Sequence, residues 1–155
     1  MEEFFTYREF MHSDDRELTP SMEDYLEMIF RLCENTGYTR IHDIANALNV
    51  QSPSVSKMIQ KLADHGYLNY EKYGIVIVSE KGKITGKKLL NRHNLSEEFL
   101  KIIGVTENVL EETEKIEHAL DNHTLVCLSA FLAFIKQKPA FLKEYKKFYK
   151  EHFTP

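Results

Sequence analysis

Residues 40–79 read RIHDIANALNVQSPSVSKMIQKLADHGYLNYEKYGIVIVS, and this stretch decides the fold. Apolar residues recur at helical spacing over residues 40–48 and again from Ser52 towards Gly66. This spacing predicts two helices joined by a tight connection. Ser52 is expected to cap the second helix, with Pro53 in its first turn and Gly66 as its stop.

Two β-rich runs follow the second helix, over residues 67–70 and 75–79. The short connection between them, residues 72–74, predicts a hairpin. A short helix, a brief turn, a capped helix and a hairpin in this order are typical of a winged helix-turn-helix. In that motif the second helix enters the major groove of DNA.

Upstream of this stretch, Thr19 and Pro20 predict the start of a helix that Gly37 ends. Thr19 can cap this helix with its hydroxyl, and Pro20 suits the first turn because it needs no backbone N–H there.

Downstream, the pattern predicts helices only. A long helix is expected over residues 83–103, a break at Gly104 and a new helix from Thr106. Residues 124–135 are strongly apolar, so we expect that helix to be buried on most sides. Pro139 separates it from a terminal amphipathic helix. Residues 93–150 have too few polar side chains to cover their apolar ones, which indicates a surface that contacts a partner.

The predicted fold class is therefore mainly α, with a winged helix-turn-helix domain followed by an all-helical domain. Residues 19–82 form the first domain and residues 83–155 the linker helix and the second. Residues 1–18 are an aromatic extension to which the pattern assigns no role.

Charge is distributed unevenly along the chain, although the net charge is only −4. Residues 1–37 carry −7, residues 38–92 carry +5, residues 93–118 carry −5 and residues 119–155 carry +3. A cationic block that coincides with the winged motif can meet a polyanion, and acidic blocks can meet cations. The alternative is that each block is simply a solvated face.

Composition limits the remaining classes of protein. Apolar residues make up 43% and charged residues 28% of the chain, as in ordinary globular proteins. No run approaches the roughly 18 apolar residues that a membrane span needs, and the acidic N-terminus does not resemble a signal peptide. Two distant cysteines form no disulfide framework. We therefore expect a cytoplasmic protein with no membrane partner.

The candidates for DNA contact lie on the second helix of the motif and at the hairpin tip. Their hydroxyl, amide and ammonium groups suit base edges and phosphates. For each serine alone, a simple capping role is the alternative. The set is Gln51, Ser52, Ser54, Ser56, Lys57, Gln60, Lys61, Lys72 and Tyr73.

Three groups of residues have side chains suited to a divalent cation. Their spacing places Asp24 and Glu27 on nearly one face of the first helix, and Glu114, Glu117 and His118 in one cluster on a later helix. His93 lies between the two groups in the sequence. Carboxylates and imidazoles without thiolates suit Mn²⁺ or Fe²⁺ better than a structural zinc site.

Structural alternatives remain open for each of these groups. Asp24 can be the acid of a capping box with Ser21. The cluster of Glu114, Glu117 and His118 can be a solvated face, and His93 can be an ordinary helix histidine. Spacing alone does not choose between these interpretations.

Several motifs resemble bacterial manganese transport regulators, a branch of the diphtheria toxin repressor family of metal-dependent repressors. The resemblance is close over residues 19–120 and looser beyond. The motifs are TPSMEDYLE at 19–27, SVSKMIQKL at 54–62, YEKY at 70–73, RH at 92–93, FLKIIGV at 99–105 and IEH at 116–118.

The resemblance implies a homodimer that binds an inverted-repeat operator and uses Mn²⁺ as corepressor, controlling manganese uptake genes. Fe²⁺ and other divalent metals are possible ligands. It further implies that six residues hold a two-metal cluster in each subunit, namely Asp24, Glu27, His93, Glu114, Glu117 and His118. Iron-sensing relatives tend to have Met in place of Asp24 and Cys in place of Glu117, so the set resembles the manganese branch.

The chain departs from the family pattern in two places. The segment between His93 and Glu114 is one residue shorter than the pattern, and residues 1–18 precede the family core. The chain also lacks the SH3-like C-terminal domain of longer iron-type members.

Two rival functions fit parts of the sequence. One is a winged-helix regulator that senses an organic ligand. The other is a di-metal carboxylate enzyme, but such bundles usually carry paired Glu-x-x-His repeats. Here Lys115 stands three residues before His118 and no second copy exists, so we expect no enzyme.

Overall fold

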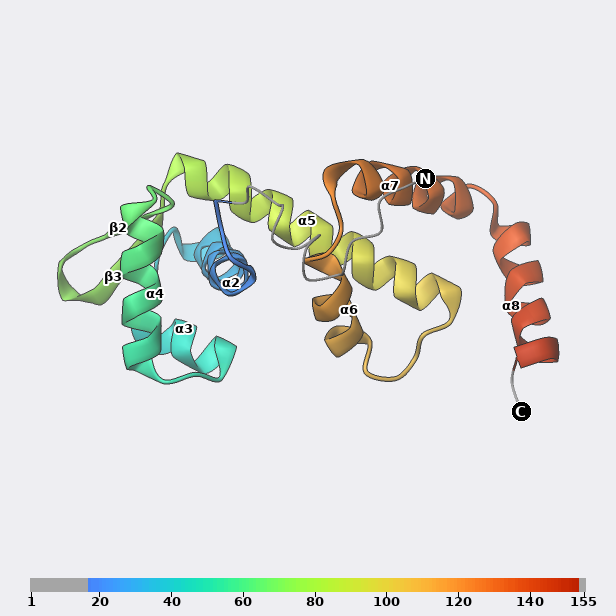
Figure 1. Cartoon of the computed structure of the whole chain (residues 1–155), viewed down its shortest axis with the longest axis horizontal. Helices are drawn as coiled ribbons and strands as arrows, with labels where there is room; N and C mark the ends of the chain where they lie inside the picture. Colours follow the sequence, from blue (N-terminus) through green and yellow to red (C-terminus); the bar gives the residue numbers. More distant parts are fainter. Residues whose placement is uncertain (1–16, 154–155) are drawn as a thin grey trace, which may run out of the picture. The chain divides into compact units, whose positions relative to one another are not determined.

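The computed structural model describes residues 17–153 and forms a mainly helical chain with one small sheet (Figure 1). The predicted extension lies outside the described residues apart from Glu17 and Leu18. The chain divides into two compact units, Met1–Leu90 (unit 1) and Asn91–Pro155 (unit 2). The elements are α2 (Pro20–Thr36), β1 (Thr39–Arg40), α3 (Ile41–Leu48), α4 (Ser52–Asp64), β2 (Leu68–Tyr70), the 3₁₀ turn η1 (Lys72–Gly74), β3 (Ile75–Val78), α5 (Glu80–Ile103), α6 (Val109–Glu117), α7 (Asn122–Lys136) and α8 (Pro139–Phe153).

Unit 1 confirms the winged helix-turn-helix. The helices α3 and α4 follow each other across a tight connection, and β2 and β3 form the predicted hairpin. The sequence prediction missed β1, which pairs antiparallel with β3 and places β3 in the middle of a three-stranded sheet. Its two residues are too few to give a strand pattern in the sequence.

The core of unit 1 consists of aliphatic side chains from α2, α3 and α4 packed against the sheet. Each helix contributes apolar residues from one face, at the spacing that the sequence showed. The largest fully buried apolar side chains are Leu26, Ile29, Ile44, Ile59 and Leu62. Their packing fixes the orientation of α4 and leaves its other face exposed.

The helix starts give one confirmed and one wrong prediction. Thr19 caps α2 as predicted, since its Oγ1 accepts a hydrogen bond from the Met22 N–H at 3.3 Å. Ser52 does not cap α4. The helix begins at Ser52 itself, and Gln51 is the N-cap, with no side-chain capping bond. Pro53 therefore occupies the second helical position, which is still within the predicted first turn.

The helix α5 begins three residues before the predicted start. Ser79 precedes it, and its Oγ accepts a hydrogen bond from the Gly82 N–H at 3.0 Å while donating to the Gly66 carbonyl at 2.6 Å. The sequence prediction treated Ser79 as the end of a strand and so missed its second role as a capping residue. The helix then continues through residue 90, where unit 1 ends.

In unit 2, α6 begins at Val109 and not at Thr106 as predicted. The residue before it, Asn108, has a φ of 52° in the left-handed region. Asparagine tolerates this conformation better than most residues, so the chain turns there instead of entering the helix earlier. The delayed start shortens α6 to nine residues, of which Glu117 is the last.

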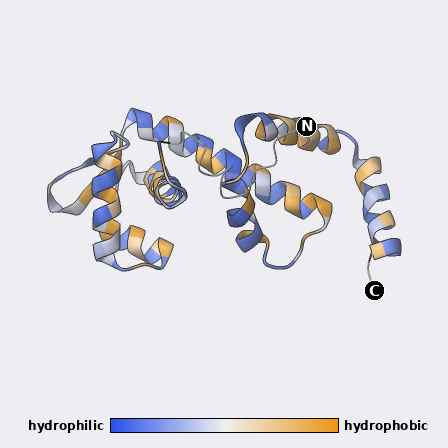
Figure 2. Ribbon diagram, viewed as in Figure 1, coloured by the Kyte–Doolittle hydropathy of each residue, from blue (hydrophilic) through white to orange (hydrophobic). Residues whose placement is uncertain are grey.

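The expected burial of the apolar helix is wrong for the single chain. Along α7, only Leu132 and Ile135 are buried, whereas Val126 is 68% and Phe134 is 52% exposed. Figure 2 shows this helix coloured mostly as hydrophobic. Within unit 2, the remaining helices are too few to cover it. The exposed apolar side chains of α7 therefore form a candidate for the expected partner surface.

Among the described residues, no single helix has both the length and the apolar character to cross a membrane. The helices α7 and α8 meet the criterion only when taken together, and they are bent by 99° at the break between them.

Acid should weaken the N-terminal cap of α7. The carboxylate of Asp121 accepts a hydrogen bond from the Thr124 N–H at 2.6 Å, and this bond lowers the pKa of Asp121. Because the folded pKa lies below the unfolded one, the ionised form stabilises the fold above the unfolded pKa. This stabilisation is lost as the pH falls through the folded pKa.

The variant Asp121→Asn keeps the acceptor but removes the charge. Thermal unfolding followed by circular dichroism should therefore show a gap in Tm between wild type and variant that closes below about pH 4. Other titrating groups are common to both proteins and cancel in the comparison. An equal gap at every pH would contradict the capping role of the charge.

Candidate metal centre

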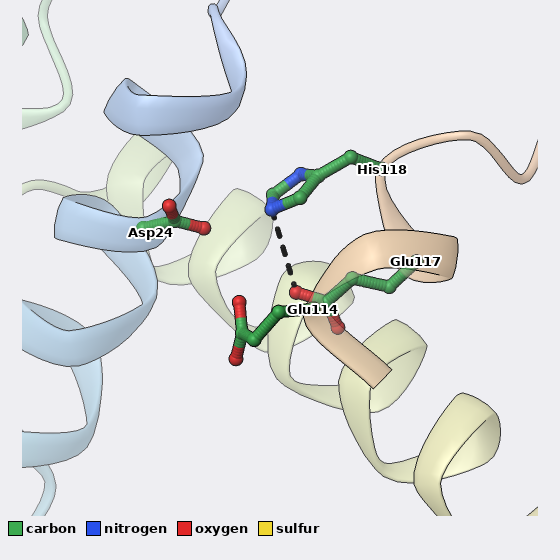
Figure 3. A group of neighbouring side chains, drawn as sticks. All are labelled: Asp24, Glu114, Glu117 and His118. Carbon is green, nitrogen blue, oxygen red and sulfur yellow. Dashed lines mark ion pairs between the residues drawn. The ribbon is translucent and has the colours of Figure 1, made fainter. Parts of the chain in front are cut away.

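Four of the six predicted metal ligands lie together in unit 2. His93 lies on α5, Glu114 and Glu117 lie on α6, and His118 is the residue that ends α6. Figure 3 draws the three from α6 and its end, together with Asp24, which lies on α2 of unit 1. The spacing of three and four residues along α6 places its carboxylates and the imidazole on one side of the helix.

Glu117 is the centre of this group. Its Oε2 lies 3.0 Å from the Nδ1 atom of His93, and its Oε1 lies 3.7 Å from the Nε2 atom of His118. The second of these contacts is the dashed line in Figure 3. The Oε1 atom of Glu114 lies 3.4 Å from the same His93 nitrogen. One ligand atom from each of Glu114, Glu117 and His118 lies within 4.8 Å of the others.

The burial of Glu117, the central residue of this cluster, excludes the interpretation that it lies on a solvated face. The side chain of Glu117 is only 1% exposed, and that of His93 is 8% exposed. Glu114 is 44% exposed and so lies at the edge of the group. Both oxygens of Glu117 are buried and accept no hydrogen bond among the described residues. A buried carboxylate in this state is costly unless a cation compensates it.

The donor chemistry of the group fits a hard or borderline divalent metal. It offers carboxylate oxygens and imidazole nitrogens, which suit Mn²⁺ and Fe²⁺. The two cysteines of the chain lie elsewhere, with Cys33 buried in unit 1 and Cys127 exposed on α7. The residues present therefore fit the metal that the sequence predicted, without a thiolate.

Asp24 and Glu27, the other two predicted ligands, lie three residues apart on α2 in unit 1. Glu27 is buried and forms an ion pair with Arg31 one turn further along the helix. The capping-box interpretation of Asp24 is wrong. The N-cap of α2 is Thr19, so the capping-box position three residues later is held by Met22.

Sequence reasoning missed Arg92 as a residue of this centre. Its guanidinium is buried, and Nη2 lies 3.0 Å from the Nδ1 atom of His118. The only signal was its place directly before His93 in the sequence. Nothing in the spacing showed that an arginine on α5 would reach the residue that ends α6.

The predicted DNA-contact residues occupy the exposed face of α4 and the hairpin tip. Of those on α4 and at its N-cap, all are exposed, namely Gln51, Ser52, Ser54, Ser56, Lys57, Gln60 and Lys61. Lys72 and Tyr73 belong to η1, and Tyr73 is 89% exposed with a φ of 67°. Two of the helical side chains have local partners, since Ser56 donates to the Ser52 carbonyl and Gln60 to Asp64.

A winged helix-turn-helix with an exposed second helix, joined to a helical unit with a buried carboxylate–imidazole group, defines a metal-dependent DNA-binding regulator. The family comparisons agree. Residues 17–76 match the iron dependent repressor N-terminal DNA binding domain, and residues 79–145 match the metal binding and dimerisation domain of the same family. The chain belongs to the iron-dependent repressor family, whose members are transcriptional regulators and not enzymes.

Individual relatives are similar over most of the chain. The HTH-type transcriptional regulator MntR of Oceanobacillus iheyensis is 46% identical over 134 residues, which cover 86% of this chain and 91% of that protein. MntR of Bacillus subtilis is 44% identical over 86% of this chain and 94% of that protein. The solved manganese regulator SloR is 31% identical with a TM-score of 0.66, covering 76% of this chain and 55% of its own. The chain thus spans about half the length of that solved relative.

Proposed function

We propose that this chain is a Mn²⁺-responsive transcriptional repressor that binds an inverted-repeat operator as a homodimer and controls manganese uptake genes. Residues 19–82 contact the DNA, and residues 83–155 carry metal binding and dimerisation. The observation that carries the proposal is the buried carboxylate of Glu117 between two imidazoles. The family and the names of the similar MntR proteins support the choice of DNA and manganese. The protein acts in the cytoplasm, where its operator lies.

The proposed ligand set contains two metals per subunit and draws on both units of the chain. Unit 2 provides the four ligands described above, and unit 1 provides Asp24 and Glu27. Support comes from the residue types, all six of which carry oxygen or imidazole donors, and from the family's metal-binding domain. Other divalent metals such as Fe²⁺ fit the same donors.

The mechanism follows from charge. Bound Mn²⁺ supplies the positive charge that neutralises carboxylates on α2 and α6. Without that charge, Asp24 and Glu27 repel the carboxylates of Glu114 and Glu117, and the DNA-binding unit samples many arrangements. When the repulsion is removed, the two α4 helices of a dimer are held nearer to the spacing that DNA requires. None of the six ligands needs to touch DNA.

The test of this function is operator binding by gel shift at fixed salt, titrated separately with Mn²⁺, Fe²⁺, Zn²⁺ and an aromatic acid. Salt is fixed because DNA affinity depends steeply on it. We expect Mn²⁺ to raise operator affinity and the aromatic acid to leave it unchanged. Stimulation by the organic acid alone would instead support a regulator that senses an organic ligand.

Lys57 provides a separate test of the DNA-binding face. It is exposed on α4, and Lys57→Gln should weaken operator binding about tenfold and reduce the salt dependence by about one ion, as expected for one lost phosphate contact. Fluorescence anisotropy over a range of salt concentrations measures both. Lys143→Gln, on an exposed position of α8, is the matched control. Equal losses of operator affinity for the two variants would contradict the assignment of α4 to the DNA interface.

A further inference from the structure

A buried arginine holds one of the histidines of the metal centre. Arg92 is 8% exposed, and its Nη2 atom lies 3.0 Å from the Nδ1 atom of His118. Both residues belong to unit 2, on α5 and at the end of α6. On the other side of the same ring, Nε2 lies 3.7 Å from the buried Glu117 carboxylate.

The chemistry of this contact is fixed by the guanidinium. Arginine carries only N–H donors and stays protonated, so the Nδ1 atom of His118 must accept the hydrogen bond with its lone pair. The proton of a neutral ring then lies on Nε2. In this arrangement, the lone pair of Nδ1 accepts the hydrogen bond from Arg92, and Nε2 carries the ring proton.

Neither nitrogen of His118 can therefore ligate a metal while Arg92 stays in place. Ligation through Nδ1 needs the lone pair that the guanidinium occupies. Ligation through Nε2 moves the ring proton to Nδ1, and an N–H there would face the N–H groups of Arg92. In both cases the contact between Arg92 and His118 must break.

We propose that Arg92 is a built-in competitor of the metal, an internal cation that positions His118 in the metal-free protein and withdraws when the metal binds. The inference rests on the proposed function, since it assumes that His118 is a ligand. As a consequence, the metal affinity of the site is lowered. A metal must displace a charge-assisted hydrogen bond before His118 can ligate it. The effect is the same for every divalent metal, because the guanidinium contact is lost whichever metal enters.

The test is metal binding by Arg92→Gln, measured by competition with a fluorescent chelator for Mn²⁺ and separately for Zn²⁺. A charge-assisted hydrogen bond is worth about one power of ten in an equilibrium constant, so both metals should bind about tenfold more tightly to the variant. Lys101→Gln is the matched control, because it removes one positive charge from an exposed position of the same helix. It should leave both affinities near those of wild type.

A second measurement uses the wild-type protein and so does not depend on the folding of the variant. In ¹⁵N NMR spectra, the Arg92 side-chain N–H signal and the His118 ring nitrogens should both shift when diamagnetic Cd²⁺ is added. Unchanged signals with bound Cd²⁺, or equal or weaker Mn²⁺ binding by folded Arg92→Gln, would overturn the role of Arg92 alone. Absence of Mn²⁺ binding by the wild type would overturn the proposed function and this inference together.

Discussion

Replacing Glu117 with glutamine should abolish Mn²⁺-stimulated operator binding and leave the dimer intact. The carboxylate is buried between His93 and His118, and the amide is similar in size but carries no charge to attract a cation. Loss of even a supporting residue at a metal site typically lowers affinity by roughly 10–100-fold. For a residue that touches both imidazoles we expect about a hundredfold loss of Mn²⁺ affinity.

Three measurements separate this effect from a loss of structure. Chelator competition reports Mn²⁺ affinity, gel shift reports operator binding, and analytical ultracentrifugation reports the dimer. Because a buried charge is costly, metal-free Glu117→Gln should unfold at a temperature no lower than that of wild type. Glu111→Gln is the matched control, since Glu111 lies on the same helix but is exposed and pairs with Lys115. Unchanged Mn²⁺-stimulated binding by Glu117→Gln would refute its assignment as a ligand.

Replacing Gly82 with alanine should destabilise unit 1 by about 3 kcal/mol, the upper end of what overpacking costs. Helix propensity alone predicts the opposite, since alanine in a helix interior is favoured over glycine by about 1 kcal/mol. The packing decides the sign. A Cβ at Gly82 would lie 2.1 Å from the Tyr67 carbonyl oxygen and 2.7 Å from the Cγ1 atom of Val78. The carbonyl belongs to the backbone, so it cannot rotate away as a side chain can.

The matched comparison is Gly86→Ala one turn further along α5. There the new Cβ would lie 2.7 Å from the Cβ atom and 2.8 Å from the Cγ atom of Phe30. Because the Phe30 Cβ is fixed to the backbone of α2, it cannot rotate away, and Gly86→Ala should also destabilise unit 1, by about 2 kcal/mol. Urea denaturation followed by circular dichroism measures both free energies of unfolding. A Gly82→Ala variant as stable as wild type would show that the start of α5 does not depend on this close approach.

The winged domain could be predicted because its local signals agree with its packing. Gly37 and Gly66 both have a positive φ at the ends of helices, where the sequence placed stops. The prediction failed where the residue types alone did not determine which residue caps a helix. Ser52 is a good capping residue, but the Gln51 carbonyl accepts the hydrogen bonds of the first turn, so α4 begins at Ser52 itself. These errors shift a boundary by one to three residues and leave the fold class unchanged.

The metal centre was less predictable because its parts meet through tertiary packing. Periodicity grouped Glu114, Glu117 and His118 in one cluster, but it left open the alternative that the cluster is a solvated face. Only the packing of α5 against α6 shows that Glu117 is buried and that Arg92 reaches His118. Spacing along one helix carries no information about a side chain from another.

If a second copy covers the exposed apolar face of α7, the stability of this regulator depends on the protein concentration. The family's second domain is a dimerisation domain, which makes a second copy a partner suited to such a face. Each tenfold dilution of such a dimer reduces the free energy of association available for stability by about 1.4 kcal/mol. Copy number itself becomes an input to repression, alongside the supply of metal.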